Sequence, residues 1–154
     1  MTEAPAPRIF VDADACPVKE EVYRVARRYQ LAVFVVANSF IRTPPDASIQ
    51  GVVVDAGADL ADDWIAERAG ARDIVITSDI PLADRSLKAG AQALAPNGKP
   101  FTTSSIGGAM AGREIGEHLR SFGAITGGPK AFSAQDRSKF LSALDAAVHK
   151  ARRA

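Results

Sequence analysis

Acidic side chains follow three of the short apolar runs in this chain, directly where each run ends. Two ionised carboxylates as close in sequence as Asp12 and Asp14 repel each other, so solvent, a helix N-terminus, a shared proton or a cation must compensate them. Carboxylates without a histidine or thiolate partner are the ligands that Mg²⁺ and Mn²⁺ prefer. We therefore expect a divalent-cation site, with Asp12 as its strongest ligand candidate.

Each acid taken alone also has an ordinary structural role, because Asp at the start of a helix caps exposed N–H groups and is favoured by the helix dipole. Asp59 and Asp62, three residues apart, fall on one side of the first turn of an expected helix. A cap needs one side chain, whereas two of the three run ends carry more than one acid. A bound metal can hold a phosphodiester oxygen and lower the pKa of a water. Hydrolysis of a nucleic-acid backbone fits that chemistry.

The acids must be positioned by the apolar runs that precede them. Runs that are apolar throughout predict strands buried on both faces, which right-handed crossovers through helices achieve. The expected fold class is α/β: a Rossmann-like three-layer α/β/α fold with a mostly parallel sheet of four or five strands, plus C-terminal helices. In such sheets ligands bind outside the carboxyl ends of the strands, where these acids fall. The expected strands are 8–12, 31–37, 51–56, 73–78 and 91–96, and the expected helices are 17–29, 60–69 and 82–89.

The remaining segments contain turn formers and one further capping signal. A Pro-Pro pair predicts a loop at 42–48, and Pro17 suits the first position of a helix. A capping box of Ser133 and Asp136 predicts a last helix over about 133–152. Between residue 96 and this helix we expect a loop, a helical segment and a second loop, at 97–108, 109–122 and 123–132.

Composition argues against several functional classes. A formal charge of +1, from 19 basic and 18 acidic residues, gives no overall basic field. One cysteine and two distant histidines argue against a zinc site and exclude an internal disulfide. No apolar run is long enough to cross a bilayer, and the N-terminus lacks a signal-peptide pattern. We expect one soluble, cytoplasmic domain over 1–154, with residues 1–7 flexible and no membrane partner.

Five segments together resemble the YaiI/YqxD family of uncharacterised bacterial proteins: VDADACPVKEEVYRVA, GADLADDWIAERA, DIVITSDIPLADRSLKAGA, NGKPFT and GGPKAFSAQDRSKFLSALD. The family's fold resembles that of the PIN/FLAP nucleases, which cut RNA or DNA with acids at the carboxyl edge of a parallel sheet. The resemblance implies a PIN-like, metal-dependent nuclease or phosphodiesterase in which Asp12 and Asp79 are catalytic. Pro81 stands where flap nucleases often carry a second acid, which leaves the second metal position open. The implied Mg²⁺ or Mn²⁺ ligands are Asp12, Asp14, Asp59, Asp62 and Asp79.

The expected partner is nucleic acid, in particular RNA, bound through its phosphates. Lys19 follows the acids closely, and its ammonium can neutralise a phosphate. Ser105 lies in a Gly/Ser-rich segment that can expose N–H groups to a phosphate, although such residues are also plain turn formers. Only 6% of the residues are aromatic, so base-stacking platforms are sparse and sequence specificity should be low. The predicted substrate-binding residues are Lys19, Lys99, Ser105 and Arg113.

Other interpretations use the same residues. The DADAC segment also resembles the first motif of haloacid dehalogenase phosphatases, with Asp12 as nucleophile, but no acid pair follows between Ala89 and Arg113. A phosphoacceptor receiver domain fits the acids and Thr77, but has no place for two C-terminal helices. A nucleic-acid-binding or nucleotide-binding protein with a vestigial acidic site is the non-enzymatic alternative. Cys16 is interpreted as a packed side chain rather than a nucleophile.

Overall fold

A five-stranded parallel sheet organises the fold. A computed structural model describes residues 6–13, 16–55, 60–111 and 133–153. Within these residues the strands lie in the order β3-β2-β1-β4-β5, and every neighbouring pair is parallel. The strands are β1 (Arg8–Asp12), β2 (Ala32–Ala37), β3 (Ile49–Val53), β4 (Ile74–Ile76) and β5 (Gln92–Leu94).

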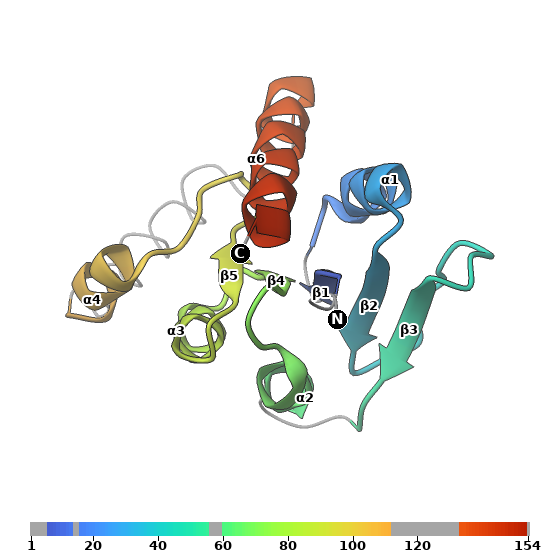
Figure 1. Cartoon of the computed structure of the whole chain (residues 1–154). Coiled ribbons are helices and arrows are strands. Elements are labelled where there is room, and N and C mark those ends of the chain that lie inside the picture. Colours follow the sequence, from blue (N-terminus) through green and yellow to red (C-terminus); the bar gives the residue numbers. More distant parts are fainter. Residues whose placement is uncertain (1–5, 14–15, 56–59, 112–132, 154) are drawn as a thin grey trace, which may run out of the picture.

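Helices cover both faces of this sheet and give the molecule three layers (Figure 1). α1 and α6 pack against each other on one face, whereas α2 and α3 lie on the other, with α4 beside α3. The expected three-layer α/β fold is confirmed. The helices are α1 (Lys19–Tyr29), α2 (Leu60–Arg68), α3 (Ile80–Lys88), α4 (Thr103–Ala111) and α6 (Ala134–Arg153).

The central strand β1 is buried on both faces, which is why its sequence is apolar rather than alternating. Ile9 and Val11 belong to the core cluster beneath α1 and α6, and Phe10 belongs to the cluster beneath α2. Phe10 stacks on Phe34 of β2 with 5.2 Å between ring centroids, and Trp64 of α2 lies 6.1 Å from Phe10. Two apolar clusters therefore pack against the opposite faces of β1.

The order of the strands creates a switch point beside β1. The chain passes from β1 to β2 and β3 on one side, and then returns to place β4 and β5 on the other. The carboxyl ends of β1 and β4 therefore lie side by side, and the chain leaves them in opposite directions along the sheet. In open parallel sheets this crevice is where ligands bind.

Helix α4 corrects one prediction. It occupies Thr103–Ala111, most of which was expected to be loop. The loop prediction is wrong because Thr102 and Ser105 cap this helix reciprocally. The N–H of Thr102 donates to Ser105 Oγ at 2.9 Å, and the N–H of Ser105 donates to Thr102 Oγ1 at 3.0 Å.

Two helix starts show how capping decides a boundary. α1 begins at Lys19, later than expected, because Pro17 and Val18 form a turn and no side chain caps the helix. The predicted capping box of the last helix is confirmed. The N–H of Ser133 donates to the Asp136 carboxylate and the N–H of Asp136 donates to Ser133 Oγ, both at 3.1 Å.

The other boundaries shift by a few residues or fall outside the described residues. β3 begins and ends earlier than the predicted 51–56, β4 and β5 are shorter than predicted, and the loop at 42–48 has no helix or strand. The described residues do not include most of the predicted helix 109–122 or any of the predicted loop 123–132. None of the helices that the structure describes is long and apolar enough to cross a bilayer.

Arg8 and Asp73 form an ion pair at the amino-terminal edge of the sheet, the edge opposite the predicted acids. Asp73 is 3% exposed, and its carboxylate accepts hydrogen bonds from Arg8 Nε at 3.2 Å and Nη2 at 2.8 Å. It also accepts from the backbone N–H groups of Arg8, at 3.1 Å, and Gly70, at 2.9 Å. Asp73 therefore fastens the start of β1 to the segment that leads into β4.

We predict that Asp73→Ala lowers the free energy of unfolding by about 2 to 4 kcal/mol, because it leaves two part-buried backbone N–H groups and the Arg8 guanidinium without their acceptor. Urea denaturation measures the loss. The matched control is Asp63→Ala, which breaks the exposed Asp63–Arg85 pair (2.7 Å) and should cost less than about 1 kcal/mol. Equal losses in the two variants would contradict the role given to Asp73.

Candidate active site at the carboxyl edge of the sheet

A hydrogen bond joins the ends of β1 and β4 at the switch point. Asp12 is the last residue of β1, and Thr77 directly follows β4. The Thr77 hydroxyl donates to Asp12 Oδ2 at 2.8 Å. Thr77 is 1% exposed, and its backbone N–H donates to Leu94 of β5 at 3.1 Å. A buried hydroxyl therefore holds the Asp12 carboxylate in place.

Asp79 is connected to the same hydroxyl. Its backbone N–H donates to Thr77 Oγ1 at 2.9 Å. Its carboxylate caps α3, because Oδ1 accepts from the N–H of Leu82 at 2.9 Å. The second carboxylate oxygen has no hydrogen-bond partner among the residues that the structure describes. Asp79 is thus a helix cap that keeps one oxygen available.

Asp12, Thr77 and Asp79 form one hydrogen-bonded unit, which brings together the two acids predicted to be catalytic. Pro81 lies in the first turn of α3, where its missing N–H costs nothing. Thr77 is the member that sequence analysis did not assign to this site, because it fell inside the predicted strand 73–78 as one more β-branched residue.

The other predicted metal ligands are not assembled around this unit in the described part of the chain. Asp14 and Asp59 lie outside the described residues. Asp62 is half-buried in the first turn of α2, and the neighbouring Asp63 pairs with Arg85. Among the described residues, no group of three or more His, Cys, Asp or Glu side chains is placed to hold a metal ion.

Two cations stabilise the segment that follows β1. Lys19 donates from Nζ to the carbonyl of Cys16 at 3.0 Å. Arg137 of α6 donates from Nη1 to the carbonyl of Pro17 at 2.8 Å and to Glu21 Oε1 at 3.0 Å. An ammonium has three donors, so Lys19 retains donors for a ligand. Arg137 instead ties the last helix to the turn at the acidic edge.

The remaining predicted substrate-binding residues lie on the segment after β5. Lys99 is exposed in the turn that precedes α4. The Ser105 hydroxyl takes part in the α4 cap and also donates to the carbonyl of Thr102 at 3.1 Å. Arg113 lies outside the described residues. For Ser105, a capping role therefore accounts for its position.

Cys16 is a packed side chain in the turn after β1, as expected. It is 6% exposed and belongs to the core cluster beneath α1. Burial raises the pKa of its thiol, a nearby backbone hydrogen bond at Val18 opposes the shift, and Asp12 adds to it. A protonated, buried thiol is a poor nucleophile.

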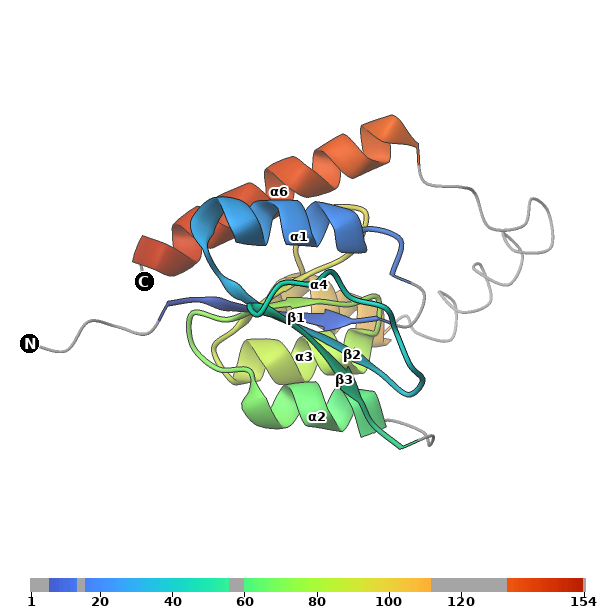
Figure 2. The ribbon, with the colours of Figure 1, turned by 90° about the vertical axis from the view of Figure 1, so that its right-hand side faces the viewer.

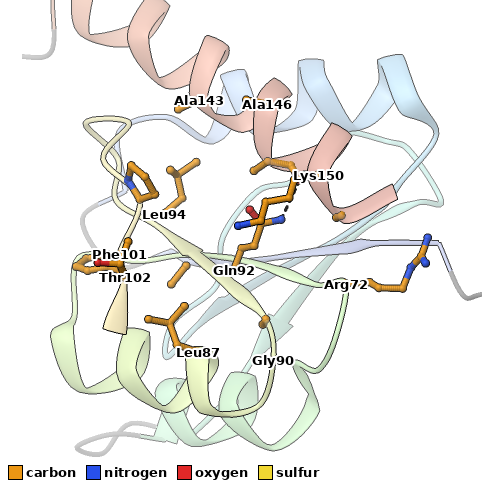
Figure 3. A pocket seen from close by; sticks show the side chains of 15 residues that line it. Arg72, Leu87, Gly90, Gln92, Leu94, Phe101, Thr102, Ala143, Ala146 and Lys150 are labelled. Atoms are coloured by element: carbon orange, nitrogen blue, oxygen red, sulfur yellow. Dashed lines mark hydrogen bonds between the residues drawn. The ribbon is translucent and has the colours of Figure 1, made fainter. Parts of the chain in front are cut away.

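A cavity of about 500 Å³ lies between β5, α3 and α6, beside Gln92, Leu94 and Phe101. Figure 3 shows Gln92 directed across it toward α6, where its Nε2 donates to the carbonyl of Ala147 at 2.9 Å. None of its lining side chains is acidic. This cavity is therefore distinct from the unit formed by Asp12, Thr77 and Asp79.

Comparisons with known proteins give one consistent family. A family model described as "Uncharacterized BCR, YaiI/YqxD family" matches residues 10–150. A UPF0178 protein of Caulobacter sp. (strain K31) is 66% identical, over 94% of this chain and 96% of the relative. UPF0178 proteins of Caulobacter vibrioides (strain NA1000 / CB15N) and Rhodopseudomonas palustris (strain BisB18) are 61% and 60% identical, each over 95% of this chain and over 95% and 94% of the relative. No solved structure matches the chain.

We predict that Thr77→Val lowers the free energy of unfolding by about 1 to 3 kcal/mol, because the Asp79 N–H and the Asp12 carboxylate lose a buried partner. Urea denaturation measures the change. Thr77→Ser keeps the hydroxyl and should recover most of the stability. If the Ser variant were as unstable as the Val variant, the threonine methyl group and not the hydrogen bonds would carry the effect.

We also predict that iodoacetamide modifies Cys16 at least about 10-fold more slowly in the native protein than in concentrated urea, at about pH 8. The thiolate is the reactive form, and a raised pKa keeps the buried thiol protonated where an exposed thiol begins to ionise. Mass spectrometry of timed samples measures both rates. Equal rates would show that the thiol is accessible and ionised.

Proposed function

The chain belongs to the YaiI/YqxD family, and from this premise we propose that it is a metal-dependent nuclease or phosphodiesterase acting on RNA or other nucleic acid. The observation that carries the proposal is the Asp12–Thr77–Asp79 unit at the switch point of the sheet. Ligands of open parallel sheets bind at this position. The Thr77 hydroxyl contacts the carboxylate of Asp12 and the backbone N–H of Asp79. Asp12 exceeds what capping of α3 requires, since Asp79 alone supplies the cap.

The donor set suits a hard cation. Asp12 and Asp79 offer carboxylate oxygens, and no thiolate competes, because Cys16 is buried and its pKa is raised. Asp14, Asp59 and Asp62 are proposed to complete the ligands from the adjoining segments. A bound Mg²⁺ or Mn²⁺ would lower the pKa of a water and neutralise charge on a phosphodiester oxygen.

Other residues of the chain would orient Asp12 and bind the phosphates of the substrate. Thr77 fixes the orientation of the Asp12 carboxylate and cannot itself be a nucleophile without giving up that bond. Lys19, anchored at the turn after β1, would attract a phosphate as a point charge. Lys99 would add a second, exposed cation on the segment after β5. Contacts of this kind hold the backbone of a nucleic acid and read little of its sequence.

The proposal predicts Mn²⁺-dependent cleavage of mixed-sequence RNA or DNA that chelator abolishes. Asp12→Asn should reduce the cleavage rate at least about 100-fold and weaken Mn²⁺ binding, measured by calorimetry. Asparagine keeps an oxygen that can accept from Thr77, and at residue 79 it also keeps the helix cap. Asp79→Asn should therefore lose activity without unfolding.

The matched control is Asp63→Asn, which removes an exposed acid that already pairs with Arg85. It should leave cleavage and Mn²⁺ affinity unchanged. Absence of Mn²⁺ binding together with absence of cleavage would overturn the proposal. Metal-independent binding of nucleic acid without cleavage would instead identify a non-catalytic binding protein.

A further inference from the structure

Phe40 exposes an aromatic ring on the loop that follows β2. The residue is 83% exposed, more than any other large apolar residue in the described part of the chain. A fully exposed phenyl ring gains nothing from the core. An exposed aromatic ring is a surface on which a nucleic-acid base can stack.

The loop itself is held firmly, so this exposure does not come from a loose segment. Ile41 packs against the core cluster beneath α1. Thr43 approaches the strand β3 so closely that a Cβ added at Gly51 would lie 3.3 Å from Thr43 Cγ2. Asp46 accepts from the N–H of Ser48 at 2.9 Å and from its hydroxyl at 2.6 Å. These contacts therefore anchor the loop after Phe40 and on both sides of Arg42.

Arg42 lies two residues after Phe40 and is also exposed. It makes no hydrogen bond or ion pair with any residue that the structure describes. Because Ile41 between them faces the core, Phe40 and Arg42 are presented to solvent together. The exposed ring offers a stacking surface, and the guanidinium two residues later in the chain offers a phosphate contact.

Phe40 follows the carboxyl end of β2, at the edge of the sheet that carries the acidic unit, and by Thr43 the chain has turned back along β3, where it lies against Gly51. Val36 of β2 is in register with Asp12, and the N–H of Ala13 donates to the carbonyl of Val36 at 3.0 Å. Phe40 follows Val36 by four residues, so its Cα lies at most about 14 Å from the Cα of Val36. In Figure 2 the loop leaves β2 on the side of the sheet toward which β1 points.

We infer that Phe40 and Arg42 bind an unpaired nucleotide of the substrate, with the base stacked on Phe40 and a phosphate held by Arg42. The inference rests on the proposed function and specifies its substrate as single-stranded nucleic acid. Every base has a π-face, so stacking on Phe40 tolerates any sequence. A base inside a duplex is already stacked on its neighbours and cannot use the ring.

The test measures binding of a fluorescein-labelled, mixed-sequence single-stranded oligoribonucleotide by anisotropy, in chelator so that no cleavage occurs. Phe40→Ala should raise the dissociation constant about 5- to 100-fold, whereas Phe40→Trp should retain affinity. For an abasic oligonucleotide of equal length, Phe40→Ala should have no effect. Arg42→Gln should weaken binding of both oligonucleotides and reduce the salt dependence by about one phosphate contact.

Val53→Ala is the matched control, since Val53 is 58% exposed but has no aromatic ring; it should bind as the unaltered protein does. Unchanged affinity in both Phe40→Ala and Arg42→Gln, or no binding by the unaltered protein, would overturn the inference. The inference would also be overturned if Phe40→Ala changed the molecular mass of the protein in solution and left RNA affinity unchanged, because Phe40 would then form a contact between copies of the chain.

The two proposals can fail separately. If the inference failed, metal-dependent cleavage that is lost in Asp12→Asn would still support the nuclease. Phe40-dependent binding without any cleavage would remove the nuclease and keep the binding site.

Discussion

The pairing of β1 with both β2 and β4 is the constraint on which the rest of the structure depends. Parallel pairing on both sides forces the chain to cross over and return, so helices must cover both faces. Burial by those helices requires an apolar strand, and Ile9, Phe10 and Val11 are fully buried. The strand can become polar only where it leaves the sheet. Asp12 occupies that position, beside the end of β4, and the candidate site follows from the topology.

Parallel topology also separates the charges. A helix that follows a strand starts at the carboxyl edge, so its positive dipole end faces the acids, as α3 does at Asp79. The last turns carry cations instead, at Arg27 and Arg28 of α1 and Arg68 of α2. A helix terminus contributes about 0.3 to 1 kcal/mol to a nearby charge. The dipoles therefore favour acids at the carboxyl edge and cations at the amino edge by small amounts.

Features that depend on neighbouring residues in the chain could be predicted from the sequence. Apolar runs predicted the strands, and a short-range capping box predicted the start of α6 at Ser133 and Asp136. Contacts across long separations were not predictable: Arg8 and Asp73 are 65 residues apart, and so are Asp12 and Thr77. A threonine after an apolar run looks like one more β-branched strand residue. Only the strand order shows that its hydroxyl meets the acid.

The direction of the hydrogen bonds in the acidic unit limits what its members can do. The Asp79 backbone N–H can only donate, so Thr77 Oγ1 must accept from it. The single hydroxyl hydrogen of Thr77 is then directed to Asp12, whose ionised carboxylate accepts it. The backbone N–H of Asp79 therefore fixes the direction of both hydrogen bonds, so Thr77 directs its hydrogen to Asp12 and orients that carboxylate.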